Sequence, residues 1–196
     1  HNDVAKDVKE GESDELKGGY LVHDTLAKRL TRGTPLPVTT RMFEPWAQKV
    51  LTGEGKIVAE QKLAITADFG PCGYFDRSVW FRSVADVIKI NGRVALLADW
   101  KTGKIVEDSQ QLALGAACVF AHYPEVQAVR SEFIWLKEDA QTSETFRRSD
   151  MPGMWANLMP RIKALQHAHD TTSYPANPGK LCKRWCPVAQ CPHYGE

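Results

Sequence analysis

The stretch from 79 to 111 constrains the fold of this chain more than any other. An Asn-Gly pair, Asn91-Gly92, lies there between two runs of apolar and β-branched residues. Asn-Gly in this setting is a strong signal for a β-hairpin with a two-residue type I′ turn. With Asn91-Gly92 as the turn, Ile90 pairs with Arg93, and this sets the register of the whole hairpin.

Charged residues on the two strands of this hairpin fall on one face. Counting back from the turn, Asp86 pairs with Leu97. Side chains alternate along a strand and directly paired residues share a face, so Asp86, Leu97, Asp99 and Lys101 lie together. The two aspartates are then diagonal neighbours, roughly 7–8 Å apart at the backbone.

Two carboxylates and an ammonium group on one apolar strand face suit a hard divalent cation such as Mg²⁺. Such an ion can neutralise charge on a phosphodiester and lower the pKa of a water. The alternative is a structural ion pair at the hairpin, between Asp99 and either Lys101 or Arg82.

The rest of the chain predicts an α/β protein. Helices are expected over 1–10, 20–30 and 39–50, a strand over 56–66, a buried apolar helix over 112–121, a strand over 126–136 and a helix over 154–167. The strand–helix–strand succession implies a crossover and parallel pairing. We therefore predict a mixed central β-sheet with an antiparallel hairpin and a parallel crossover strand, flanked by helices. We place one domain at 1–170 and a cysteine-containing segment at 171–196.

Length and composition narrow the class of protein. The 196 residues, 43% of them hydrophobic, are enough for one domain with a sizeable core, and the net charge of +1 gives no overall basic signature. No apolar run approaches the ~20 residues of a membrane span, and the start has no signal-peptide pattern. Because the chain begins with His1 rather than Met, we expect residues to precede it. Five cysteines, three of them near the end, favour a reducing, cytoplasmic compartment over a secreted disulfide framework.

The second hairpin strand resembles a known nuclease motif. The segment 99–103, Asp-Trp-Lys-Thr-Gly, is similar to the D-x-K-T-G motif of the PD-(D/E)xK nuclease superfamily, in its RecB-like branch. Four further features of that branch have counterparts here, in chain order: His1 for the helical histidine, Glu60 on the preceding strand, Ser83-Val84-Ala85-Asp86 for G-x-x-D, and Gln111 with Gly115 for Q-x-x-x-Y. Ser replaces Gly in the third, and Gly replaces Tyr in the fourth.

This resemblance implies a restriction-endonuclease-like core and a Mg²⁺- or Mn²⁺-dependent deoxyribonuclease. It implies an exonuclease acting in DNA recombination, repair or phage DNA metabolism, in a bacterial or phage-infected cell. Asp86 and Asp99 would hold the metal, with His1 and Glu60. Lys101 would orient the water or stabilise charge at the phosphate, and Gln111 would help to position the substrate.

Two of these residues also have structural interpretations. Glu60 can be a surface carboxylate paired with Lys62. Asp108 and Gln111 have the spacing of a capping box, in which the Gln side chain reaches back to the start of the helix. A helix that starts beside the Asp99 strand end leaves room for a second role of Gln111.

Three clustered cysteines, Cys182, Cys186 and Cys191, have spacings of four and five in a loop-rich tail. Thiolates at such spacing hold Zn²⁺ or an iron–sulfur cluster. The RecB-like branch often ends in three cysteines that bind a [4Fe–4S] cluster with a fourth, upstream cysteine. Candidates for a fourth ligand here are Cys72, Cys118 and His193. Three free thiols are the alternative.

DNA is the partner that these features imply, with a homo-oligomer or a recombination or helicase partner as further options and no membrane. Two other classes of protein remain open. One is a non-catalytic nucleic-acid-binding or adaptor module that retains the nuclease fold. The other is a zinc-dependent binding protein whose functional site is the cysteine tail.

Overall fold

The computed structural model describes residues 14–106, 108–186 and 188–195. The chain divides into two compact units, one from Gly18 to Trp155 and one made of Ala156–Glu196 with the chain before Gly18. The expected domain boundary at 170 falls inside the second unit and stays a prediction. His1 and the helix expected over 1–10 lie outside the described residues.

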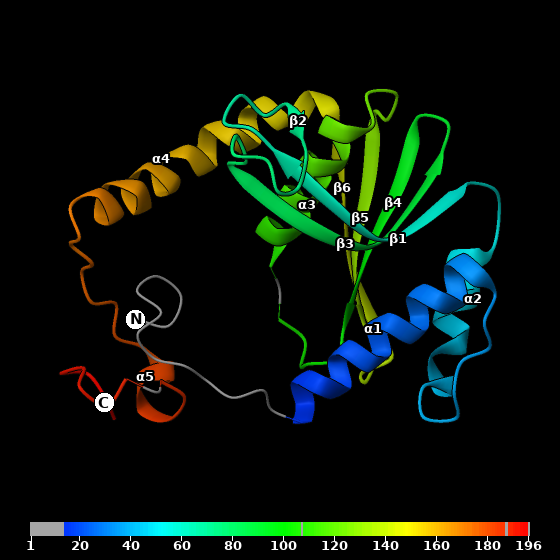
Figure 1. The fold of residues 1–196 in the computed structure, drawn as a ribbon, viewed down its shortest axis with the longest axis horizontal. Helices are drawn as coiled ribbons and strands as arrows, with labels where there is room; N and C mark the ends of the chain where they lie inside the picture. The colour runs from blue at the N-terminus through cyan, green and yellow to red at the C-terminus, as the bar shows by residue number, and fades with distance from the viewer. Residues whose placement is uncertain (1–13, 107, 187, 196) are drawn as a thin grey trace. The chain divides into compact units, whose positions relative to one another are not determined.

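A six-stranded mixed sheet forms the centre of the Gly18–Trp155 unit (Figure 1). Its spatial order is β2-β1-β3-β4-β5-β6. The strands are β1 (Lys56–Ile65), β2 (Pro71–Cys72), β3 (Phe81–Asn91), β4 (Val94–Lys101), β5 (Ala128–Trp135) and β6 (Ala140–Arg147). β4 and β5 pair in parallel, and every other neighbouring pair is antiparallel. The predicted mixed sheet with its hairpin and parallel crossover strand is confirmed.

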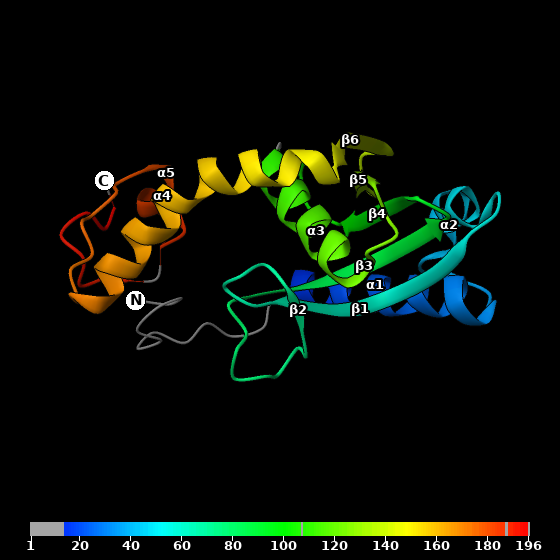
Figure 2. The same ribbon diagram turned by 90° about the horizontal axis from the view of Figure 1, so that it is seen from above.

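Helices cover both faces of this sheet (Figure 2). α1 (Asp14–Arg32), the 3₁₀ turn η1 (Arg41–Phe43) and α2 (Glu44–Leu51) lie on one face, and α3 (Ser109–His122), the β4–β5 crossover, lies on the other. The apolar core under the first layer is made of Leu26, Leu30, Leu36, Phe43, Ala47, Val50, Val87, Ala98, Trp100, Ile134 and Leu136. α3 is apolar on most of its circumference because strands and neighbouring elements bury it on several sides.

The hairpin register differs from the predicted one by two residues. Asn91 pairs with Val94, so the turn residues are Gly92 and Arg93. Of these two, only Gly92 takes a positive φ, 56°, which is the pattern of a type II′ turn with glycine first rather than of type I′. Because side chains alternate with a period of two, a shift of two changes the partner of each residue and leaves the expected alternation of faces unchanged. Leu97 packs towards Gly115 of α3, whereas the Asp86 carboxylate reaches His23 of α1.

Several elements differ from expectation in extent or existence. α1 begins at Asp14 and includes two glycines, which the sequence-based prediction placed before the helix. The strand β6 was not predicted, since its residues 140–147 are mostly polar and half-exposed with no clear alternation. The last long helix, α4 (Met151–Asp170), extends the predicted one at both ends, and α5 (Lys180–Arg184) lies in the predicted link and tail.

Among the described helices, none is both long enough and apolar enough to cross a membrane.

Candidate functional site

The ladder between β1 and β3 is interrupted at one position. Pairs continue on either side, Ala59 with Val87 and Gln61 with Ala85, but no pair joins Glu60 to Asp86, which stand opposite each other. Glu60 has a φ of 51°, in the left-handed region. A non-glycine residue held there costs of order 1–3 kcal/mol, and such strain is concentrated at functional sites. At this interruption of the β1–β3 pairing, the carboxylates of Glu60 and Asp86 lie close together.

Asp86 also lies where β3 separates from β4. The last β3–β4 pair is Val87 with Ala98. Next to this pair, the Asp86 carboxylate takes the place of a backbone carbonyl as hydrogen-bond acceptor. Its Oδ2 accepts a hydrogen bond from the backbone N–H of Trp100 at 2.8 Å. Its Oδ1 lies 3.1 Å from Nδ1 of His23 on α1. The side chain is 8% exposed, so sheet and helix fix the position of this carboxylate.

His23, Glu60 and Asp86 together form a candidate metal site. One ligand atom from each lies within 4.8 Å of the other two. Across residues 14–106, 108–186 and 188–195, this is the only set of three such side chains close enough to share one ion. An imidazole nitrogen with two carboxylates is a donor set that divalent transition metals accept.

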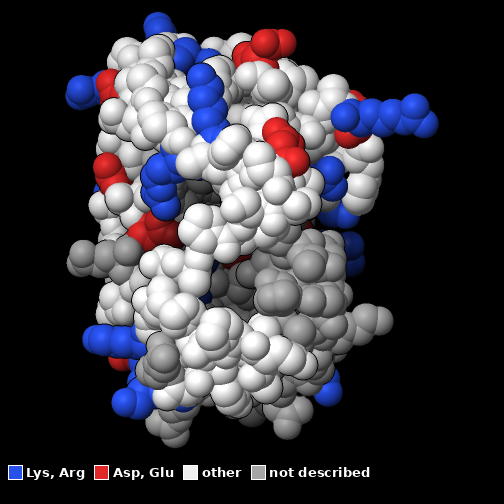
Figure 3. Space-filling view, turned by 90° about the vertical axis from the view of Figure 1, so that its left-hand side faces the viewer, with Lys and Arg blue, Asp and Glu red and all other residues white. Residues whose placement is uncertain are grey.

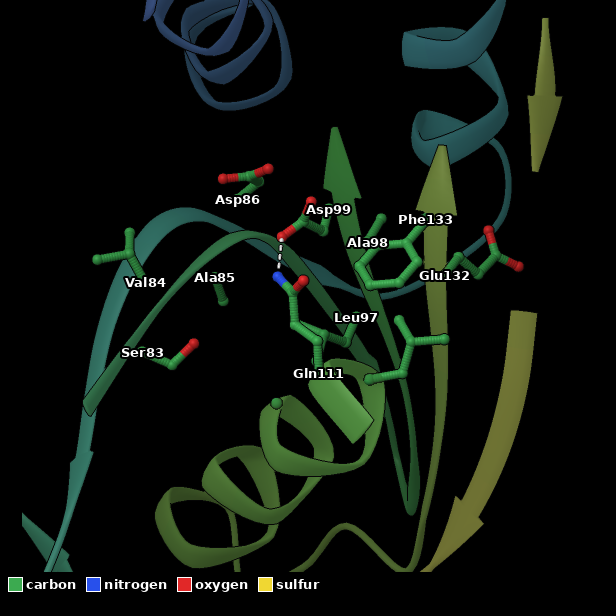
Figure 4. Close-up of a pocket in the computed structure, with 12 residues that line it drawn as sticks. Ser83, Val84, Ala85, Asp86, Leu97, Ala98, Asp99, Gln111, Glu132 and Phe133 are labelled. Carbon is green, nitrogen blue, oxygen red and sulfur yellow. Dashed lines mark hydrogen bonds between the residues drawn. The ribbon is translucent and has the colours of Figure 1, made fainter. Parts of the chain in front are cut away.

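Asp99, Lys101 and Gln111 form a second, adjacent group. Lys101 Nζ lies 2.9 Å from Asp99 Oδ2. The Gln111 side chain donates to Asp99 Oδ1 at 3.3 Å, and its oxygen accepts from Lys101 at 3.3 Å. Figure 4 shows Asp86 and Asp99 next to each other, with Gln111 reaching Asp99 from the start of α3. Lys101 also lies 4.7 Å from the centre of the Phe133 ring, which limits its freedom on that side.

The pKa values of this site reflect crowded negative charge. Burial, and next the charge of Asp86, raise the pKa of Asp99 although Lys101 opposes this. Burial and the same Asp86 charge raise the pKa of Glu60. Burial alone would lower the pKa of His23, but its hydrogen bond to Asp86 and the surrounding carboxylates raise it above the usual value. A cation bound here would relieve all three effects.

Gly115 allows α3 to approach the sheet at this site. A Cβ at Gly115 would lie 2.7 Å from Cδ2 of Leu97 on β4, closer than packed carbons tolerate. Gly115 and Leu97 line a small pocket together with Asp86, Asp99 and Gln111. A side chain larger than hydrogen at this position would therefore meet β4.

The predicted residues are therefore brought together, in two groups. Glu60 and Asp86 belong to the candidate metal site, whereas Asp99 contacts Lys101 and Gln111. Asp108 caps α3 by accepting from the backbone N–H of Gln111 at 3.1 Å, as the capping-box spacing predicts. The Gln111 side chain turns to Asp99 instead of back to the cap.

His23 was not among the predicted site residues. It lies three residues before Leu26 and seven before Leu30, both buried in the core. That i, i+3, i+7 spacing places His23 on the sheet-facing stripe of α1, and a histidine on such a stripe was the signal available in the sequence. His1, the histidine predicted for this role, lies outside the described residues.

The cysteine tail, in the other unit, folds back on itself. The backbone N–H of Gly195 donates to the carbonyl of Cys182 at 3.0 Å. Cys182, Cys186 and Cys191 are half-buried free thiols, and within the part of the chain that the structure describes they do not form a set close enough to share one ion. Zinc or an iron–sulfur cluster at this tail stays a prediction.

Basic side chains do not form one band on the face drawn in Figure 3, where Lys and Arg are dispersed among acidic residues. Arg148 donates to the carbonyls of Tyr123 and Val126 at 2.8 Å each and lies over the Phe120 ring, so its guanidinium group is engaged within the fold. Because the net charge is only +1, recognition of a polyanion would depend on local groups of charge rather than on overall charge.

Neither a protein-family model nor a curated protein matches this sequence.

Proposed function

We propose that this protein is a metal-dependent deoxyribonuclease of the RecB-like PD-(D/E)xK type. The observation that carries this proposal is the convergence of five predicted side chains, from three strands and α3, on one place in the sheet: Glu60, Asp86, Asp99, Lys101 and Gln111. Carboxylates, an ammonium group and an amide at one such place have the chemistry needed to cleave a phosphodiester.

The donor set fits a divalent metal. His23, Glu60 and Asp86 would hold the ion, and Asp99 lies close enough for its pKa to respond to Asp86. Mg²⁺ prefers oxygen ligands, so the imidazole of His23 favours Mn²⁺ of the two expected ions. When bound, the metal supplies positive charge for the phosphate and lowers the pKa of a water.

The protein's own residues orient and balance charge at the reaction. Asp86 is held by Trp100 and His23, which fixes the position of its two carboxylate oxygens. Lys101 places a positive charge 2.9 Å from Asp99, where it can stabilise negative charge that develops on the phosphate. Gln111 contacts both residues and holds them in register with the start of α3.

Lys101→Ala and Asp99→Asn test this proposal with end-labelled double-stranded and single-stranded DNA in Mn²⁺ or Mg²⁺. We expect wild-type protein to degrade DNA and each variant to lose at least about a hundredfold in rate. Lys101→Ala removes a positive charge that stabilises the transition state, and Asp99→Asn removes the carboxylate that positions Lys101. Lys104→Ala and Asp68→Asn are matched controls on exposed residues and should retain activity.

If wild-type protein degrades no DNA with either ion, or if the two site variants equal their controls, the nuclease proposal is wrong. The non-catalytic nucleic-acid-binding module would then be the better description. Exonuclease action, a cytoplasmic setting, and oligomeric or helicase partners stay predictions from the family resemblance.

A further inference from the structure

The loop between β1 and β3 carries an exposed group of aromatic and basic side chains. Phe75 is 77% exposed, and its ring centre lies 5.0 Å from that of Tyr74 in an edge-on arrangement. Lys62 on β1 lies over both rings, 5.6 Å from the centre of Tyr74 and 5.3 Å from that of Phe75. Arg82 on β3 lies 5.1 Å from the Tyr74 ring. We name Lys62, Tyr74, Phe75 and Arg82 the aromatic–basic group.

This loop has a defined conformation around the exposed rings. The Asp76 carboxylate accepts a hydrogen bond from the backbone N–H of Gly73 at 2.7 Å, and this bond stabilises the turn. The backbone N–H of Trp80 donates to the carbonyl of Ile65 at 2.9 Å and closes the base of the loop.

A second aromatic cluster anchors the loop from beneath. Phe69 stacks on Trp155 of α4 with ring centres 4.4 Å apart, and both rings contact Trp80. Phe75 takes no part in this apolar cluster. An apolar ring that remains exposed on an anchored loop is therefore available to a ligand.

The aromatic–basic group lies on the same side of the sheet as the Asp86 carboxylate. Lys62 pairs with Val84 in the β1–β3 register, and directly paired residues share a face. Val84 and Asp86 point to one side of β3 while Ala85 points to the other (Figure 4). Val84 is 40% exposed and lies between the aromatic–basic group and the Asp86 carboxylate along this side of β3. Two residues of strand, about 6–7 Å, separate Lys62 from Glu60 along β1.

We infer that the aromatic–basic group is a stacking platform for an unpaired base of single-stranded DNA, whose backbone then continues to the carboxylates. This inference rests on the proposed nuclease function and adds the substrate class. Exposed aromatic rings stack on bases of any sequence, and flanking cations bind the phosphates. Bases within a duplex are already stacked and cannot use the Phe75 ring in this way.

Binding without cleavage tests the platform directly. Fluorescence anisotropy would measure the affinity of Asp99→Asn protein in EDTA for a fluorescein-labelled oligothymidylate and for a blunt duplex. On this background we expect Phe75→Ala to weaken oligothymidylate binding by roughly tenfold or more and to leave duplex binding unchanged. Phe75→Trp should restore the affinity, whereas Phe75→Leu should not. Met42→Ala, which removes another exposed apolar side chain in the same unit, is the control.

The cations give an independent measurement. Replacing Lys62 and Arg82 with Ala should make the dependence of log affinity on log salt shallower, by about 0.7 for each single-strand phosphate that the protein no longer neutralises. Arg93→Ala at the hairpin turn is the matched control and should leave this slope unchanged. Thermal unfolding of each variant confirms that the fold is retained.

Unchanged oligothymidylate affinity in Phe75→Ala, or equal reductions for Phe75→Ala on single strands and on duplex, would overturn the platform. This result is distinguishable from failure of the nuclease proposal, because binding is measured without hydrolysis. A selective reduction of oligothymidylate binding in Phe75→Ala supports the platform even in a protein that cleaves nothing.

Discussion

Asp86 gives the sharpest test of the site, because two different substitutions separate its role in the fold from its role in metal binding. In Asp86→Ala the backbone N–H of Trp100, a residue only 2% exposed, has no acceptor in the Asp86 side chain. An unsatisfied buried donor costs about 1–3 kcal/mol. Asp86→Asn keeps an oxygen that can accept from Trp100, so it avoids this cost.

The expected difference between the two variants is measurable by thermal unfolding. At about 2–4 °C per kcal/mol for a chain of this length, a difference of about 2 kcal/mol places the Tm of Asp86→Ala about 4–8 °C below that of Asp86→Asn. Removing the Asp86 charge also relieves its repulsion with Glu60 and Asp99, and this relief is common to both variants. It therefore cancels in the comparison.

Metal binding should separate both variants from wild type. Mn²⁺ at a hundred times its Kd stabilises a folded protein by about 2.7 kcal/mol, which corresponds to a rise in Tm of about 5–10 °C for wild type. Both Asp86 variants lack the charged ligand and should not show this rise. The reasoning is refuted if Asp86→Asn retains the full Mn²⁺ shift, or if the two variants unfold at the same temperature in EDTA.

Three other parts of the molecule give predictions of their own. Gly115→Ala should lower the free energy of unfolding by about 0–2 kcal/mol in a denaturant titration, because overpacking costs about 1–3 kcal/mol while alanine is a better helix former than glycine by about 1 kcal/mol. The raised pKa of His23 contributes stability that is fully present below the ordinary histidine pKa of 6.5 and is lost as the pH rises through the folded-state pKa. In EDTA, the Tm of wild type should therefore exceed that of His23→Gln by more at pH ~6 than at pH ~9. Protons and metal compete for the His23 imidazole, so Mn²⁺ affinity measured by calorimetry should rise over the same range. If the tail holds zinc or an iron–sulfur cluster, Cys186→Ser should lower the metal content measured by elemental analysis, whereas Cys118→Ser, in buried α3, should not.

Periodicity in the sequence predicted a large part of the fold. The hairpin, the apolar α3 and the parallel return of β5 all have residue patterns with one structural interpretation. β6 has no such pattern, because an exposed edge strand needs no alternation of apolar and polar residues. The predicted turn type was wrong because both Asn-Gly and Gly-Arg can occupy a two-residue turn, and pairing over the whole hairpin decides between them.

The site was predictable to the same extent. Asp86, Asp99 and Lys101 were placed on one face by counting residues, and the error of two in register left that face unchanged. His23 was missed because α1 is far from the hairpin in sequence and its packing angle decides which side chain reaches Asp86. The interruption at Glu60 also depends on the pairing of β1 with β3, and no local pattern predicts it.

At Glu60, the residue that would best stabilise the backbone is not the residue that the candidate metal site requires. Glycine is the residue that adopts this backbone conformation without strain, yet glycine would remove one carboxylate of the candidate metal site. A substitution to glycine would therefore relax β1 and at the same time remove one carboxylate from the cluster. Among homologues, a carboxylate kept at this position would indicate selection for the site, and glycine would indicate selection for stability.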